Sequence, residues 1–323
     1  MRFLAHVHGY AGVHSAGAER YLEALLEFLV DKGHDCKVLT ASNMGVDGEV
    51  RGGVTLDTKC HLPEAIEECY KETDYVITHL DLTPKVIELC RKYNKKLIYI
   101  VHNYHSIPYW EVQPGDCWMV LYNAEWMEKY HVEQIKFKHD NTFTLIPPTN
   151  FEKFHFKSEV SREDITLVNL NMNKGVLQFI EQAKQNPQYS FRGVIGAYGD
   201  QKLERLPNNI KLINHTKDIV NDVFKYTKIL MMPSLKETWG MAAIEAMCSG
   251  IPVIAHPTEG LLEACGDAGL FALRDKTYVW KDLISMLMEN KDQYNYWSEK
   301  ALSRAKFLYK KAYEQLEELE KKF

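Results

Sequence analysis

Residues 233–255 read PSLKETWGMAAIEAMCSGIPVIA, and this stretch decides how the rest of the chain is interpreted. An apolar run at residues 228–232 precedes it and stops at a proline, as expected of a buried strand that ends at the edge of a parallel sheet. After a polar loop, the helix-forming residues 238–248 are followed by a glycine and a proline, which commonly end a helix. Residues 251–255 are again apolar. The pattern predicts strand, loop, helix and strand, the repeating unit of a parallel α/β sheet.

Two acids lie in this unit at positions that suit a binding site. Ligands of open α/β sheets bind beside the carboxyl ends of the strands, where a helix that begins there presents unpaired N–H groups to an anion. Glu237 lies just before the predicted helix, and Glu245 follows about two turns inside it. Carboxylates so placed accept hydrogen bonds from ligand hydroxyl groups. Either acid alone is more often a solvated charge or a complement to the helix dipole.

The order of these residues resembles a known signature. Glu-Thr-Trp-Gly at residues 237–240, followed by Glu-Ala-Met-Cys-Ser-Gly-Ile-Pro-Val-Ile-Ala at residues 245–255, resembles the donor site of the retaining glycosyltransferases of family four. The resemblance implies that Glu237 contacts the transferred sugar and that Glu245 contacts the ribose of the nucleotide. It also implies that four backbone amides face the sugar and the diphosphate, those of Thr238, Trp239, Gly240 and Met241.

The composition of the chain limits the classes of protein to which it can belong. The chain has 323 residues, of which 46% are hydrophobic and 26% charged, and no apolar run approaches the roughly 20 residues that a membrane span needs. The N-terminus lacks the long apolar core of a secretory signal, and the seven cysteines include no Cys-x-x-Cys pair. We therefore expect a cytoplasmic protein with reduced thiols and no transmembrane segment. The formal net charge of −5 gives no general attraction to nucleic acid.

The N-terminal part reads as a Rossmann-like opening. An apolar strand at residues 2–8 and a glycine-containing loop precede an amphipathic helix at about residues 18–32. The glycines of the loop do not have the Gly-x-Gly-x-x-Gly spacing of a nicotinamide site. The segment Ala16-Gly-Ala-Glu-Arg instead resembles the Gly-Gly-Ala-Glu-Arg start of the same family, with alanine in place of the first glycine. Gly17 is our candidate for contact with the donor diphosphate, and Gly12 is an auxiliary one.

Histidines follow two further predicted strands. His79 ends the apolar run 75–78 and His102 ends the run 96–101, so both are expected at the carboxyl edge of the sheet. His102 matches the strand-end histidine that the family places near the reacting side of the sugar. A lone histidine is usually structural, but this position favours a catalytic role.

The second half supplies the expected donor-binding residues. Lys174 lies in a strand-to-helix loop, where a lysine is well placed for phosphate. The family pairs this lysine with an arginine about five residues earlier, where this chain has Asn169. Stabilisation of the leaving group would then depend more on Lys174 and on helix N-termini. Loops containing Gly196 and Thr216 are the candidates for holding the nucleobase.

The resemblance extends from Gly17 to Gly269 and implies an α/β fold of the GT-B type, in which the parallel sheets of two Rossmann-like domains face each other across a cleft. We expect an acceptor-side domain at residues 1–155 and a donor domain at residues 156–300. Residues 301–323 are expected to form a C-terminal helix, part of which crosses back to the first domain.

The predicted function is metal-independent, retaining transfer of a sugar from a nucleotide-diphosphate sugar to an acceptor hydroxyl, with Glu237, His102 and Lys174 as catalytic residues. We expect no cofactor, because the nucleotide sugar is a co-substrate. The sequence leaves the acceptor open: a lipid, a saccharide, a small molecule or a modified nucleic-acid base. It also leaves peripheral membrane contact open.

Three other functions remain open at this point. A nucleotide-sugar-binding module without turnover is consistent with Ala16 and Asn169. A GT-B epimerase or phosphorylase would share the donor signature. A metal-dependent hydrolase is the least favoured, and its candidate ligands are the histidines His6, His8, His79, His102 and His105.

Overall fold

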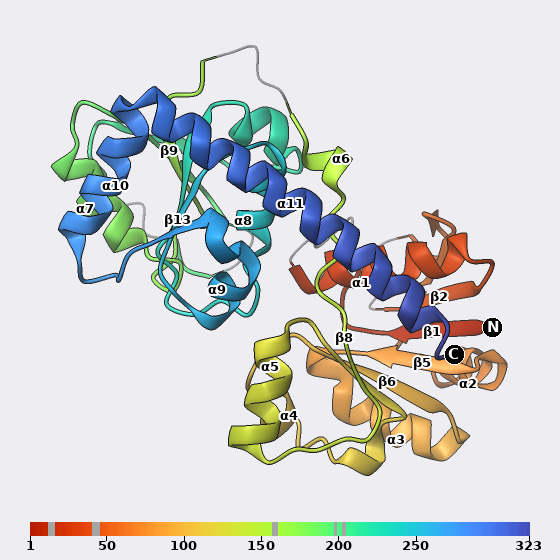
Figure 1. The fold of residues 1–323 in the computed structure, drawn as a ribbon. Coiled ribbons are helices and arrows are strands. Elements are labelled where there is room, and N and C mark those ends of the chain that lie inside the picture. Colours follow the sequence, from red (N-terminus) through yellow and green to blue (C-terminus); the bar gives the residue numbers. More distant parts are fainter. Residues whose placement is uncertain (12–16, 41–45, 157–160, 197–198, 202–204) are drawn as a thin grey trace. The chain divides into compact units, whose positions relative to one another are not determined.

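The computed structural model describes residues 1–11, 17–40, 46–156, 161–196, 199–201 and 205–323. These residues form two compact units, one made of residues 1–148 with 311–323 and the other of residues 149–310. Each unit is built on one mostly parallel sheet with helices packed on it (Figure 1). The sequence pattern placed the boundary near residue 155, whereas the units divide between Pro148 and Thr149.

The first unit contains, within the described residues, an eight-stranded sheet of order β3-β4-β2-β1-β5-β6-β7-β8. All neighbouring strands are parallel except β3 and β4, which form a short antiparallel pair at one edge. Its strands are β1 (Arg2–His6), β2 (Asp35–Leu39), β3 (Val50–Arg51), β4 (Val54–Asp57), β5 (Tyr75–Thr78), β6 (Lys96–Val101), β7 (Met119–Tyr122) and β8 (Thr142–Thr144). Since β1 leads to β2 on one side and β5 to β6 on the other, the strand order reverses between β1 and β5.

Helices connect these strands, as the alternation of apolar runs and amphipathic segments predicts. They are α1 (Gly17–Asp31), α2 (Pro63–Glu72), α3 (Thr83–Tyr93), α4 (Ser106–Tyr109) and α5 (Glu125–Tyr130), together with the short 3₁₀ helices η1 (Leu80–Leu82) and η2 (Pro114–Asp116) and the π-helix η3 (His131–Ile135). The buried stripe of α1, which includes Leu22, Leu25 and Leu29, packs into the core with the central strands. The buried residues of α1 recur at the helical spacing that is visible in the sequence.

The last residues of the chain complete this core. Helix α11 (Lys291–Glu320) is continuous, and its residues from Lys311 onward belong to the first unit. Leu316 and Leu319 are buried in the core of that unit. The ring of Phe323 lies 5.0 Å from that of Phe3 and forms part of the same aromatic group. No helix within the described ranges is both long enough and apolar enough to cross a membrane.

The second unit has, within the described residues, a six-stranded parallel sheet of order β11-β10-β9-β12-β13-β14. Its strands are β9 (Asp164–Val168), β10 (Ser190–Val194), β11 (Ile210–Ile213), β12 (Thr227–Met232), β13 (Val253–Ala255) and β14 (Gly269–Phe271). In sequence rank this order is 3-2-1-4-5-6, that of the doubly wound sheets that bind nucleotides. The order reverses between β9 and β12, and the crevice for ligands is expected there.

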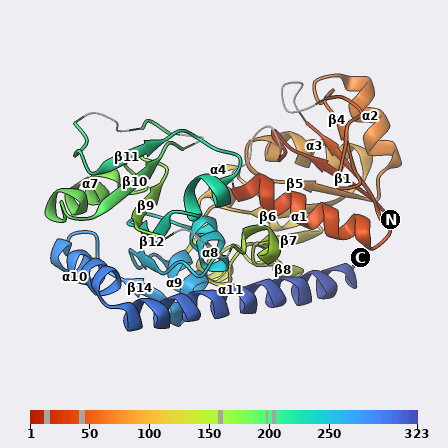
Figure 2. The ribbon, with the colours of Figure 1, turned by 90° about the horizontal axis from the view of Figure 1, so that it is seen from above.

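The helices of this unit pack on its sheet. They are α6 (Phe151–Phe154), α7 (Val176–Gln185), α8 (Met241–Cys248), α9 (Glu259–Cys265), α10 (Thr277–Glu289) and the first part of α11, with the π-helix η4 (Val220–Phe224) and the 3₁₀ helix η5 (Gly266–Ala268). Helices α7 and α10 contact each other (Figure 2). Helix α8 contacts β12 and β13. Because parallel crossovers are right-handed, the connections that leave β9 and β12 in opposite directions place α7 and α8 on opposite faces.

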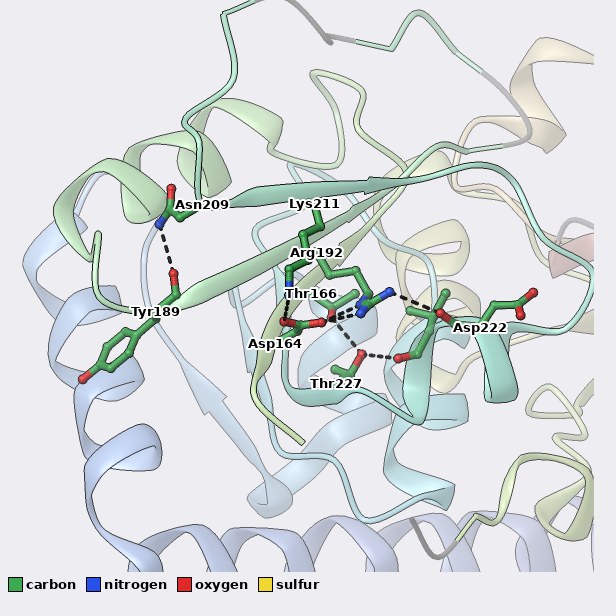
Figure 3. Close-up of polar contacts among 9 residues, drawn as sticks. Asp164, Thr166, Tyr189, Arg192, Asn209, Lys211, Asp222 and Thr227 are labelled. Carbon is green, nitrogen blue, oxygen red and sulfur yellow. Dashed lines mark hydrogen bonds and ion pairs between the residues drawn. The ribbon is translucent and has the colours of Figure 1, made fainter. Parts of the chain in front are cut away.

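A polar network holds the amino ends of the central strands together. Figure 3 shows Asp164, the first residue of β9, beside the guanidinium of Arg192 on β10 and the ammonium group of Lys211 on β11. Arg192 Nε donates to Asp164 Oδ2 over 2.7 Å, and both side chains are almost fully buried. The hydroxyls of Thr166 and Thr227 join β9 to β12 over 2.8 Å. Since these groups lie at the amino ends, the carboxyl ends of the same strands remain available for binding.

Candidate functional site

The loops that follow β9 and β12 flank the point where the strand order of the second sheet reverses, and they contact each other. Lys174 Nζ donates to Glu237 Oε1 over 2.5 Å. The backbone N–H of Leu235 donates to the carbonyl of Asn173 over 2.7 Å. The side chains of Lys174 and Glu237 are 21% and 10% exposed, so the pair is partly desolvated yet accessible. The structure thus brings together two of the predicted catalytic residues at the expected ligand edge.

Glu237 has a second hydrogen bond that the sequence did not suggest. Ser234 Oγ donates to Glu237 Oε1 over 2.8 Å, to the same oxygen that accepts from Lys174. The hydroxyl and the ammonium group together fix one oxygen of the carboxylate. A serine two residues after a strand, three residues before an acid, is the only signal in the sequence, and it is too common to be specific.

Close backbone approaches fix the position of this loop. A Cβ atom on Gly260 would lie 2.4 Å from the carbonyl oxygen of Glu237, and one on Gly175 would lie 2.4 Å from that of Pro233. Both glycines therefore allow neighbouring segments to touch the loop that carries Glu237. The sequence predicted a helix from Thr238, but α8 begins at Met241. The reason is Gly240, whose φ of +97° breaks the helical conformation before that point.

Asn169 lies in an amide network in place of the arginine that the resemblance implies. It is 4% exposed and has a φ of +71°, a left-handed conformation that asparagine tolerates better than most residues. Its Oδ1 accepts from Asn171 Nδ2 over 3.0 Å and from Gln201 Nε2 over 2.8 Å. Gln201 Oε1 in turn accepts from the backbone N–H of Gly196 over 3.0 Å. Asn169 and Gly196, both predicted donor-binding residues, therefore share one network.

The same network extends to Lys174. The Oδ1 atom of Asn171 accepts from the backbone N–H of Lys174 over 2.9 Å, and this bond orients the loop that carries the lysine. Asn171 and Gln201 are functional candidates that the sequence did not reveal, because amide side chains in loops carry no specific signal. The asparagine, glutamine and lysine side chains supply hydrogen-bond donors and one positive charge beside the reversal point.

The other predicted donor-binding residues of the second unit differ in burial and in hydrogen-bond partners. Trp239 is 3% exposed, and its indole Nε1 is buried with no hydrogen-bond partner among the described residues. Glu245 lies inside α8 and is 2% exposed. Thr216 follows β11, where its hydroxyl donates to Asp222 and accepts from the backbone N–H of Asp218. These bonds attach Thr216 to its own turn and not to the Lys174–Glu237 pair.

The first unit holds the third predicted catalytic residue, His102. It follows β6, is buried, and its Nε2 lies 2.9 Å from Nδ1 of His79, which follows β5. Burial lowers the pKa of His79 to about 4 and the pKa of His102 well below its usual value, with a smaller effect from His79. Both imidazoles are therefore neutral near pH 7. Gly17 is the exposed first residue of α1, and Gly12 lies outside the described residues.

The histidines do not assemble into a metal site in the described part of the chain. No group of three or more histidine, cysteine, aspartate or glutamate side chains is placed there to hold a metal ion. His6, one of the candidate ligands, instead has its Nδ1 atom 3.0 Å from the hydroxyl of Tyr70. The described histidines are therefore placed to form hydrogen bonds and not to share a metal ion.

Comparison with solved structures establishes the fold. The chain matches sucrose-phosphate synthase from Thermosynechococcus elongatus with a TM-score of 0.82 at 16% identity, over 100% of this chain and 99% of that one. It matches Anabaena Alr3699/HepE, solved in complex with UDP-glucose, with a TM-score of 0.80 at 14% identity, over 99% and 100% of the two chains. These matches confirm the predicted fold class: α/β, with two parallel-dominated sheets, as in GT-B glycosyltransferases.

Comparison with curated proteins gives a shorter match. A D-inositol 3-phosphate glycosyltransferase of Mycobacteroides abscessus is 35% identical over 78 residues, which cover 24% of this chain and 18% of that protein. The protein of the same description from Nocardia farcinica is 34% identical over 73 residues, or 22% of this chain and 16% of that protein. The chain thus aligns with less than a fifth of the length of these relatives.

A family model matches a larger part of the chain than these relatives do. Residues 150–304 match the model described as glycosyl transferases group 1. This range takes in the Lys174 and Glu237 loops, the Asn169 network and nearly all of the second unit. Within this range, which is almost all of the second unit, the chain is similar to the glycosyl transferases group 1 family.

Proposed function

We propose that this protein is a retaining glycosyltransferase that moves a sugar from a nucleotide-diphosphate sugar to an acceptor hydroxyl without a metal ion. The observation that carries the proposal is the contact of Lys174 with Glu237 across the reversal point of the second sheet. A cation suits the departing diphosphate, and a carboxylate suits the hydroxyls of the sugar. Both are needed within a few ångströms of each other for this reaction.

In the proposed reaction, Lys174 stabilises the negative charge that develops on the diphosphate as the sugar leaves. Such preorganised charge is commonly the largest catalytic contribution. Glu237 accepts hydrogen bonds from sugar hydroxyls and sets the position of the anomeric carbon. Before the donor binds, the two side chains neutralise each other, and the diphosphate then competes with Glu237 for the ammonium group. Ser234 keeps the carboxylate oriented during this exchange.

The other residues would complete the donor site. Glu245 is assigned to the ribose, and the backbone amides of residues 238–241 are assigned to the sugar and the diphosphate. His102 is assigned a role as a neutral hydrogen-bonding group, because burial lowers its pKa. A neutral imidazole suits a role in orienting a sugar hydroxyl better than a role as a charged acid.

The donor and the acceptor are proposed only as classes. The solved complex of Anabaena Alr3699/HepE with UDP-glucose makes UDP-sugars the first donors to test. The D-inositol 3-phosphate glycosyltransferases among the relatives add a phosphorylated polyol to the acceptors worth testing. Lipid, saccharide, small-molecule and nucleic-acid acceptors remain in the same screen.

The test is a transfer assay with UDP-, GDP- and ADP-sugars on the wild-type chain and two variants. Glu237→Ala and Lys174→Ala are expected to abolish transfer while circular dichroism shows a folded protein. Lys184→Ala removes an exposed lysine in the last turn of α7 and serves as the control. Near-normal transfer by both site variants would refute the assignment. Loss of activity with EDTA, restored by a divalent cation, would refute metal independence.

One observation favours a second candidate, a nucleotide-sugar-binding module without turnover. Asn169 offers no charge, so Lys174 is the one cation that the loop after β9 offers to the leaving group. Tight binding of a donor, with neither transfer nor slow hydrolysis, would support the binding module. Conversion of the donor without an acceptor would indicate an epimerase, and dependence on inorganic phosphate a phosphorylase.

A further inference from the structure

Arg274 follows β14 at the carboxyl edge of the second sheet, and burial of its charge is not offset by an acid among the described residues. Its Nη2 donates to Gln178 Oε1 over 3.1 Å. Its Nη1 is buried and has no hydrogen-bond partner among the described residues. Burial lowers the pKa of the guanidinium, and no acid in the described part of the chain opposes this effect. A buried charged donor without a partner is unfavourable, and a bound anion would remove the deficit.

The contact with Gln178 places this charge at the positive end of a helix. Gln178 is the third residue of α7, and the first turn of that helix contains no acid. Unpaired N–H groups and the helix dipole favour an anion at this end and disfavour a cation. Arg274 is nevertheless held there by a hydrogen bond. Two independent sources of positive potential therefore meet at the start of α7.

A second unpaired polar atom lies beside Arg274. His256 follows β13, the strand next to β14, and its Nδ1 is buried without a hydrogen-bond partner in the described ranges. Burial and then the charge of Arg274 lower the pKa of His256, so the imidazole is close enough to sense the guanidinium. The carboxylates of Asp275 and Glu259 and a backbone contact with Ala272 act in the opposite direction. Two adjacent strand ends thus each present an unpaired buried polar atom.

We propose that Arg274 and His256 form a binding site for a phosphate-class oxyanion at the carboxyl ends of β13 and β14. Guanidinium N–H donors match the geometry and charge of phosphate oxygens better than those of neutral ligands. The imidazole nitrogen donates to a phosphate oxygen or accepts from a protonated one, according to its tautomer. The site uses neither Lys174 nor Glu237.

The oxyanion has two possible sources with the same chemistry. It is either the diphosphate of a bound nucleotide or a phosphate group on a separate molecule. In the first case Arg274 supplies the positive charge that Asn169 lacks, and this case alone rests on the proposed function. The anion site itself is defined by binding and does not require glycosyl transfer.

The test is calorimetric titration of the full chain with sodium phosphate and, separately, with UDP at constant ionic strength. The variants are Arg274→Gln and Arg274→Lys, which keeps the charge but loses the fork of donors. Lys276→Gln is the matched control, because it removes an exposed positive charge two residues away, one whose nearest acid is Asp275 at 3.6 Å. We expect Arg274→Gln to weaken anion binding roughly tenfold or more, Arg274→Lys to weaken it less, and Lys276→Gln to leave it unchanged.

The outcomes separate the two sources. A loss of UDP affinity in Arg274→Gln, with or without a loss of phosphate affinity, identifies the nucleotide diphosphate as the ligand. A loss of phosphate affinity alone identifies a separate phosphorylated ligand. Wild-type affinity of the variant for both ligands overturns the proposal, whatever the transfer assay on Lys174 shows. If Arg274→Gln does not fold, the same titrations on Arg274→Lys and His256→Asn decide the question.

Discussion

The Nζ atom of Lys174 lies 2.5 Å from the Oε1 atom of Glu237, although 63 positions separate the two residues in the chain. The contact exists because β9 and β12 are neighbours in the sheet, so that their following loops emerge side by side. Lys174 and Glu237 lie in different loops. The strand order therefore brings the two residues into contact, and a mutation of either one should change the effect of mutating the other.

The first prediction concerns this coupling. Lys174→Met and Glu237→Gln should each lower kcat/KM by about 100-fold, because each removes a group that acts on the reacting part of the donor. The double variant should lose much less than the product of the two single losses, since the residues act as a unit. Steady-state kinetics with the best donor measures the cycle. Fully multiplicative losses would show that the two side chains work independently.

The second prediction concerns the loop that carries Glu237. Gly260→Ala should impair donor binding, because the added Cβ would lie 2.4 Å from the carbonyl oxygen of Glu237 and 2.5 Å from the carbonyl carbon of Thr238. We expect a rise in the donor dissociation constant and a lower midpoint of thermal unfolding. Gly115→Ala is the control, since its Cβ would meet no atom within 4 Å in the described structure. Equal donor affinity in both variants would mean that the loop adapts without cost.

The third prediction concerns Asn169. Restoring the arginine that the family resemblance implies should not restore a phosphate-binding cation. Position 169 has a φ of +71° and is 4% exposed, and its side chain bonds to Asn171 and Gln201. Asn169→Arg should therefore lower the free energy of unfolding, by about 1–3 kcal/mol as judged from other losses of buried polar partners. Urea denaturation checks this value. A stable variant that binds donor more tightly would contradict it.

The fourth prediction concerns acid stability. Burial lowers the pKa of His79 to about 4, and burial with a smaller effect of Lys85 lowers the pKa of His6 to about 4. The unfolded chain takes up these protons near pH 6.5 and the folded chain only near pH 4. The free energy of unfolding therefore has its full value above pH 6.5 and decreases as the pH drops towards 4. The loss is at most about 3 kcal/mol for each histidine.

Urea denaturation between pH 7.5 and pH 4.5 measures this slope. His79→Asn keeps an amide that can hydrogen-bond to His102 but cannot take up a proton, so it should flatten the curve. His105→Asn, at an exposed histidine, is the control and should leave the slope unchanged. A wild-type slope in His79→Asn would show that His79 does not contribute to acid sensitivity.

The sequence predicted those parts of the fold that depend on local pattern. The apolar runs gave β12 and β13, and the helical spacing of Leu22, Leu25 and Leu29 gave α1. The start of α8 was wrong by three residues, because the left-handed conformation of Gly240 depends on its neighbours in space, among them Leu261. Glycine in a sequence permits such a conformation but does not require it.

The sequence predicted Lys174, Glu237, Asn169 and Gly196 of the candidate site, but not the other amide side chains that join them. Lys174 and Glu237 stood out because each lies in a loop after an apolar run. Gln201 did not, since it reaches Asn169 from 32 positions away. The bond between Gln178 and Arg274 spans 96 positions and depends on the packing of α7 beside the end of β14. Long-range polar contacts of this kind leave no periodic mark in a sequence.

The contribution of α11 to the first unit affects the order in which the protein becomes native during synthesis. Leu316, Leu319 and Phe323 belong to the core that Phe3 begins, and they are translated after the rest of that core. The second unit has its own core, whose members end before that point. The unit that is translated first is therefore the unit that matures last, and until residues 311–323 emerge its unfinished hydrophobic surface is exposed to chaperones.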